Sequence, residues 1–178
     1  MTSDAAELEV LRSQLAVVWR LAGVTLSGLT TEECLWVPSE DAWTVREGPN
    51  GRWVADWQEP EPDPVPPTSI AWLQWHVLWW WSTVIDRSFG DGSLRREDVV
   101  WPGASESMDA IGRLHDEWLR HLDGLAAADL SSGEMTRWPY DDGRPFAHVV
   151  AWVNIELMKN VAEMAYIRRI TPFSGASR

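Results

Sequence analysis

The fold of this chain is decided by residues 145–170, which read PFAHVVAWVNIELMKNVAEMAYIRRI. Apolar residues recur in this stretch at the three- and four-residue spacing of one helical face. Pro145 suits a first helical turn, and Pro172 predicts a stop shortly after the stretch. Arg168 and Arg169 stand where basic side chains complement the carboxyl end of a helix. The pattern predicts a long helix from about Pro145 to Ile170.

Three further segments show the same periodicity, over residues 5–29, 68–89 and 105–127. Residues 68–89 read TSIAWLQWHVLWWWSTVIDRSF and are apolar nearly all round, which predicts the most buried helix. A length of 178 residues suits one domain. The sequence therefore predicts an all-α, four-helix bundle that forms a single domain over residues 1–178.

A long connection rich in tryptophan and proline separates the first two predicted helices, over about residues 30–67. Its last part, EPEPDPVPP, nearly excludes helix. In its middle GPNG separates TVRE from RWVADW, which indicates a short hairpin, although no strand run is long enough to build a large sheet. We expect its first part to fold back over the bundle, because its four tryptophans favour burial.

The charge of the chain excludes several partners. Its formal net charge is −12, so it lacks the positive field that nucleic acids and anionic membrane surfaces require. The most apolar stretch, residues 70–85, is shorter than the roughly 20 residues of a membrane span. A single cysteine and an acidic start without an apolar secretory segment suit a cytoplasmic location.

Fourteen tryptophans in 178 residues leave two interpretations open. One is a core built largely of indole rings, each of which needs a partner for its N–H when buried. The other is an aromatic-lined pocket for an apolar or ring-containing ligand.

Polar residues interrupt the apolar face of the last predicted helix. Glu156, Asn160 and Glu163 fall on the face that Val149 and Ile167 begin and end. A buried carboxylate is costly unless it is paired or bound to a metal. His76 stands in equally apolar surroundings on the second predicted helix, so we expect it to meet Glu156 and Asn160.

This cluster has two interpretations that the residues alone leave open. His76, Glu156 and Asn160 are candidate metal ligands, since bundle cores commonly hold such sites. Alternatively, His76 and Glu156 form a hydrogen-bonded pair, with Lys159 paired to Glu156 or Glu163 at the helix edge.

Other chemistry-bearing residues favour structural roles. His115 lies on the apolar stripe of the third predicted helix and is expected to be half-buried with a partner. Cys34 has no basic neighbour in sequence that would lower its pKa, so we expect it to pack against Trp36. The sequence carries no Gly-rich phosphate loop and none of the common hydrolase motifs.

In the order of its helices and in two stretches, SIAWLQWHVLWWWSTVIDRS and PFAHVVAWVNIELMKNVAEMAYIRR, the chain resembles the DinB-like superfamily. This superfamily includes YfiT-like proteins and mycothiol-dependent enzymes, and the resemblance is greatest to an actinobacterial branch. It covers most of the chain, and it is specific in the two helices but not in the connection.

The resemblance implies a metal site of three side chains, often for zinc or nickel. One ligand is a histidine of the second helix, which matches His76, and the other two stand four apart in the last helix, which matches Glu156 and Asn160. The family has a histidine where this chain has Asn160, and an amide oxygen is a poor zinc ligand. The resemblance also implies a homodimer.

Three functions follow as hypotheses. The first is a metal-assisted transferase or isomerase that uses a low-molecular-weight thiol, with a degenerate His–Glu–Asn site. The second is a metal-free scaffold that binds a small apolar or aromatic molecule in a tryptophan-lined pocket without catalysis. The third is a structural or oligomerisation role, because family resemblance does not fix function.

Overall fold

The computed structural model describes residues 3–126 and 128–173. This part of the chain is mostly helical, as predicted. Its elements follow in the order α1 (Ser3–Leu26), α2 (Thr31–Leu35), β1 (Val45–Glu47), β2 (Trp53–Ala55), α3 (Ile70–Phe89), a 3₁₀ turn (Arg96–Asp98), α4 (Ala104–Asp123) and α5 (Ala147–Ile170).

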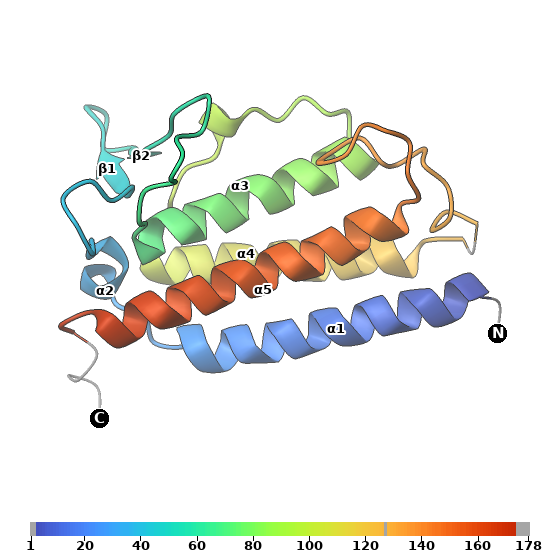
Figure 1. Cartoon of the computed structure of the whole chain (residues 1–178), viewed down its shortest axis with the longest axis horizontal. Helices are drawn as coiled ribbons and strands as arrows, with labels where there is room; N and C mark the ends of the chain where they lie inside the picture. The colour runs from blue at the N-terminus through green and yellow to red at the C-terminus, as the bar shows by residue number, and fades with distance from the viewer. Residues whose placement is uncertain (1–2, 127, 174–178) are drawn as a thin grey trace.

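The four long helices α1, α3, α4 and α5 run alongside one another (Figure 1). Helix α5 packs against both α1 and α3, and α3 packs against α4. Their ends differ from the predicted ends by a few residues. The helix predicted to reach residue 29 stops at Leu26, close to Gly28, whose positive φ of 68° leaves the helical region. The helix predicted to end at residue 127, which lies outside the described residues, stops at Asp123 before Gly124.

Helix α3 is the most buried helix, as its composition predicts. The Ser69 side chain caps it by accepting a hydrogen bond from the Trp72 amide. Two of its indole N–H groups donate to backbone carbonyls of neighbouring segments, that of Trp72 to Asp56 and that of Trp75 to Val99. The tryptophans are buried in the core or packed against it, and the bonded indoles tie α3 to the segments around it.

Among the described residues, no helix combines the length and the apolar character that crossing a membrane requires.

The connection between α1 and α3 contains more regular structure than expected. Helix α2 was not predicted, although Thr30 and Glu33 form a capping box at its start, a pattern that the sequence displays. Strands β1 and β2 form an antiparallel hairpin at the position where GPNG indicates one, and so make a small sheet.

Hydrogen bonds hold this connection against the start of α3. The Trp43 amide donates to the Pro67 carbonyl at 2.8 Å, and the Ser69 amide donates to the Trp43 carbonyl at 2.9 Å. The Thr44 and Ser69 hydroxyls lie 2.8 Å apart. The connection therefore covers the amino-terminal end of α3, at the left of Figure 1.

The packing of α5 gives a stability prediction. Leu157 is 1% exposed, whereas Ile155, two residues earlier on the same helix, is 68% exposed. We expect Leu157→Ala to lower the free energy of unfolding by about 2–5 kcal/mol, because it leaves a cavity in the core. Ile155→Ala is the matched control and should change that free energy by less than about 0.5 kcal/mol. Urea denaturation measures both, and equal effects would show that this face of α5 is misassigned.

Candidate functional site

A cleft of about 840 Å³ lies between the first half of α3, the second half of α5 and the end of the connection that precedes α3. The residues that line it include three of the polar residues that the sequence singles out, His76, Lys159 and Asn160. Its other walls are Pro38, Glu61, Val65, Pro66, Pro67, Thr68, Trp72, Leu73, Ala162, Glu163, Tyr166, Ile167 and Ile170. A cleft of this size, mostly apolar and with a few polar groups, is typical of a small-molecule site.

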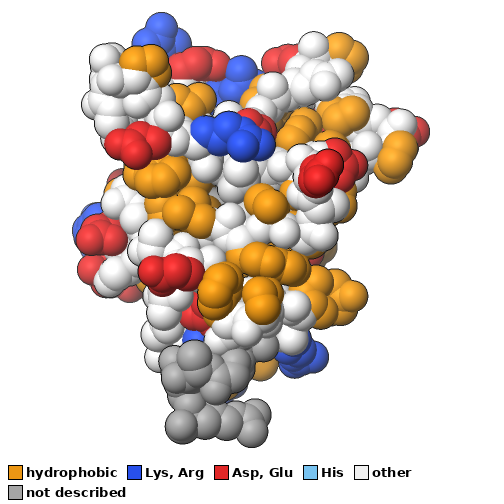
Figure 2. Space-filling view, turned by 90° about the vertical axis from the view of Figure 1, so that its left-hand side faces the viewer, with side chains coloured by type: hydrophobic (Ala, Val, Ile, Leu, Met, Phe, Trp, Pro, Cys, Tyr) orange, Lys and Arg blue, Asp and Glu red, His pale blue; other side chains and the backbone are white. Residues whose placement is uncertain are grey.

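The cleft lies at the end of the molecule where α3 begins and α5 ends. Figure 2 views this end and shows exposed hydrophobic side chains interspersed with acidic ones. Among the described residues that line the cleft, Trp72 is the single tryptophan. Proline and aliphatic side chains make up most of the apolar wall. A pocket lined by several tryptophans, one of the two interpretations of the composition, is not what this cleft offers.

Glu156 is the centre of the polar cluster beside the cleft. Its Oε1 lies 3.3 Å from His76 Nε2 and 2.5 Å from Lys159 Nζ. Burial by itself raises the pKa of Glu156. The hydrogen bonds and charges of His76 and Lys159 lower this pKa by more than burial raises it, so the net shift is downward. Glu156 is therefore an ionised carboxylate with two partners at neutral pH.

Asn160 lies one turn beyond Glu156 and is 1% exposed. Its Oδ1 accepts a hydrogen bond of 2.9 Å from Trp80 Nε1, which joins α5 to α3. His76 also contacts its own helix, because its ring stacks on Trp72 with 4.8 Å between centroids. The structure thus brings His76 to Glu156, as expected, while it gives Asn160 a different partner.

The role of these three residues as metal ligands stays a prediction, and the arrangement of polar atoms does not fit a divalent cation. The carboxylate that would bind the metal is bonded to an ammonium group, which repels a divalent ion. The Asn160 oxygen is occupied by an indole N–H. No group of three or more His, Cys, Asp or Glu side chains suited to a metal occurs in the described part of the chain.

Lys159 is the only lysine in the sequence, where every other basic residue apart from histidine is an arginine. Its ammonium supplies the positive charge that the carboxylate of Glu156 requires. The second interpretation of the cluster, a paired His76 and Glu156 with Lys159 at the edge, therefore describes the contacts that the structure contains.

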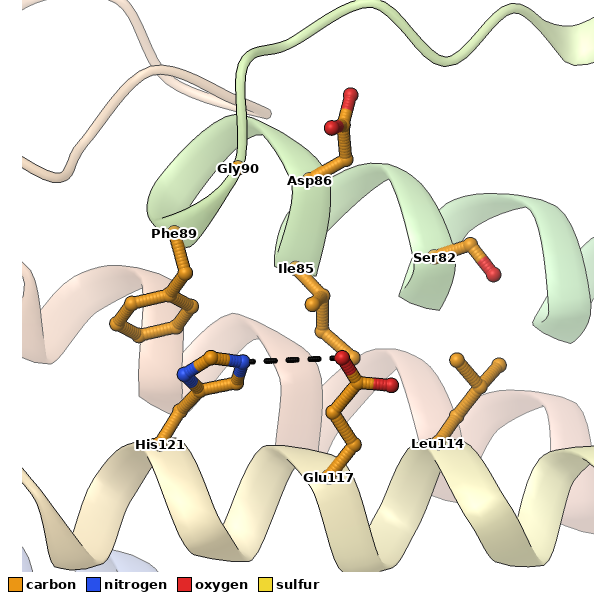
Figure 3. A pocket seen from close by; sticks show the side chains of 8 residues that line it. All are labelled: Ser82, Ile85, Asp86, Phe89, Gly90, Leu114, Glu117 and His121. Atoms are coloured by element: carbon orange, nitrogen blue, oxygen red, sulfur yellow. Dashed lines mark ion pairs between the residues drawn. The ribbon is translucent and has the colours of Figure 1, made fainter.

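A second, smaller cavity of about 360 Å³ lies between the end of α3 and α4 (Figure 3). His121 stacks on Phe89 there and lies 3.8 Å from Glu117. Asp86 is engaged elsewhere, since its carboxylate accepts hydrogen bonds from the backbone amides of Gly92 and Leu94. The ionisable side chains of this cavity already have partners within the protein, and the hydrogen bonds of Asp86 close the end of α3. The larger cleft is therefore the better candidate site.

Cys34 and His115 take structural places. The Cys34 thiol is fully buried, and burial, with the charge of Glu33, raises its pKa to about 12 despite the opposing charge of Arg168. Such a thiol is a poor nucleophile. His115 is buried, stacks on Trp19 at 4.1 Å and lies 2.9 Å from Asp116, so it has the partners expected of it.

Sequence reasoning missed the walls of the cleft. Val65, Pro66 and Pro67 come from the segment that the sequence describes only as non-helical, and Tyr166 and Ile170 are exposed apolar residues near the end of α5. For Tyr166 and Ile170, the sequence feature that could have indicated the wall is that apolar residues stand at helix positions facing solvent.

The pKa of Glu156 gives a prediction of pH dependence. A carboxyl whose pKa is lowered on folding stabilises the folded state above its unfolded pKa, and this contribution is lost as the pH falls through the folded value. We expect Glu156→Gln to lower the denaturation midpoint near pH 6 and to have much less effect near about pH 3. Glu163→Gln, at an exposed position of the same helix, is the control. An effect of Glu156→Gln that is the same at both pH values would contradict the ion pair.

Comparison with known proteins identifies the family of the chain. A family model for the DinB superfamily matches residues 53–164, which include all of α3 and α4 and most of α5. His76, Glu156 and Asn160 all lie within the matched region. No curated protein matches the chain. Since the matched region covers more than half of the sequence, the chain belongs to the DinB superfamily.

Proposed function

We propose that this chain is a metal-independent member of the DinB superfamily that binds a small, largely apolar molecule in the cleft between α3 and α5. The observation that supports this most is the position of Lys159, which lines the cleft and holds Glu156 at 2.5 Å. The ammonium group of Lys159 then supplies the positive charge that a metal ion would otherwise bring to Glu156. In this proposal the long helices form the four-helix bundle of the family, and the connection before α3 serves as one wall of the site.

The walls indicate the character of the ligand. Trp72, Leu73 and Ile167 offer apolar surface on the two helices, and Val65 and Pro66 continue it on the connection. Burying apolar surface contributes roughly 25 cal/mol per Å², so a molecule of drug-like size can bind here without a metal contact.

A neutral fluorescent dye tests the cleft. We expect Nile red to bind the wild-type chain with a rise in emission, and Ala162→Trp to abolish that rise by filling the cleft. Ala162 is exposed and lines the cleft, so the substitution does not disturb the core. Val24→Trp, which adds the same ring at an exposed position of α1 outside the cleft, is the control and should leave binding unchanged. Equal binding by all three proteins would place the dye elsewhere and contradict the proposal.

The metal independence has its own test. After treatment with a chelator, the wild-type chain should show no site-specific heat when zinc is added. The double variant Lys159→Ala, Asn160→His should bind zinc more than about tenfold more tightly, because it removes the ammonium and supplies a second imidazole. Calorimetric titration compares the two. Tight binding of zinc by the wild type would favour the alternative function, a metal-assisted transferase or isomerase that acts with a low-molecular-weight thiol.

A further inference from the structure

Two polar atoms beside the cleft have no hydrogen-bond partner among the described residues, although both are buried. They are Nδ1 of His76 and Nδ2 of Asn160, and both residues line the cleft. A buried polar group without a partner costs free energy. Other buried side-chain atoms of the described residues also lack a partner, but these two belong to residues that line the cleft, where a ligand can supply one.

The Trp80 indole decides which way the Asn160 amide points. An indole N–H can only donate, so the atom that it bonds at 2.9 Å must be the Asn160 oxygen. The unpartnered atom is then the amide NH₂, which is a donor. It requires an acceptor.

The Glu156 carboxylate decides the tautomer of His76 in the same way. An ionised carboxylate only accepts, so we assign a proton to His76 Nε2, which lies 3.3 Å from Glu156 Oε1. In the form of the ring that carries this proton alone, the unpartnered Nδ1 is an acceptor. It requires a donor.

The two helices bring these residues to the same level. Helices α3 and α5 run in opposite directions (Figure 1). His76 bonds Glu156, and Trp80, one turn further along α3, bonds Asn160, one turn further along α5. In antiparallel helices, a residue one turn further along one helix lies level with a residue one turn earlier along the other. The two bonds therefore cross, and His76 on α3 lies level with Asn160 on α5.

We propose that the cleft recognises a carboxamide with an apolar body, whose carbonyl accepts from Asn160 Nδ2 and whose N–H donates to His76 Nδ1. This inference rests on the proposed function and names the ligand class for that site. An amide presents an acceptor and a donor side by side, which is the complement of the two unpartnered atoms.

Charge favours a neutral amide over an acid or an amine. Lys159 is already paired with Glu156, and two further carboxylates, those of Glu61 and Glu163, line the cleft. An anionic head group would be repelled by these carboxylates, and an ammonium head group would leave the Asn160 donor without an acceptor. Both unpartnered atoms are covered from solvent, so the head group reaches them when a side chain at the cleft moves.

Displacement of Nile red by compounds that share an eight-carbon chain tests the head group. Octanamide should displace the dye about tenfold more effectively than N,N-dimethyloctanamide, which accepts but cannot donate. Octanoate and octylammonium should be weaker than octanamide by a similar factor. Equal displacement by octanamide and its dimethyl analogue, or stronger displacement by octanoate, would overturn the assignment.

The variant Asn160→Asp tests the named donor. Aspartate keeps an oxygen for Trp80 and replaces the NH₂ with a second acceptor, so octanamide should lose its advantage over the dimethyl analogue. Retained binding of Nile red shows that the Asn160→Asp variant is folded. If the variant does not fold, the compound series on the wild-type chain still tests the head group. If Nile red binds in the cleft but no compound displaces it selectively, the head-group assignment fails while the proposed function stands. If Nile red does not bind in the cleft, the proposed function fails first.

Discussion

The structure depends on the burial of α3. This helix is apolar nearly all round, so it is stable only when every face is covered. Helices α4 and α5 pack on it directly, and the connection from α1 is held over its first turn by hydrogen bonds at Trp43 and Ser69. Indole N–H groups of Trp72 and Trp80 donate to the connection and to α5, which adds directional contacts to a non-directional apolar surface.

The candidate site follows from the same constraint. His76 is a polar residue on a helix that has almost no exposed surface, so its partners must come from a packed neighbour. Glu156 on α5 is that partner, while Asn160, one turn further along α5, accepts from Trp80. Lys159 then balances a carboxylate that burial would otherwise penalise. The result is a polar seam between two apolar helices, open on one side to a cleft.

The sequence predicts these features to different depths. The four long helices and the hairpin follow from local periodicity and from GPNG, and the meeting of His76 with Glu156 follows from their placement on apolar faces. Helix α2 escaped notice because the capping pattern at Thr30 lies in a segment dominated by tryptophan and proline. The partner of Asn160 and the proline wall of the cleft depend on how distant segments pack, and helical spacing along one chain carries no information about that.

The single lysine limits where reagents that acylate amines can modify the chain. Apart from an α-amino group at the chain start, a sequence with one lysine offers one primary amine, and here that amine lies at the cleft and bonds Glu156. Acetylation of Lys159 would remove its charge and leave the carboxylate with His76 alone. Any acetyl or acyl donor that modifies lysine side chains therefore acts on this protein at its candidate site, and amine-directed cross-linkers or surface coupling would do the same. Such reagents do not modify the arginines that make up the rest of the basic residues apart from histidine, so among side chains of lysine and arginine the modified and unmodified chains would differ at Lys159 alone.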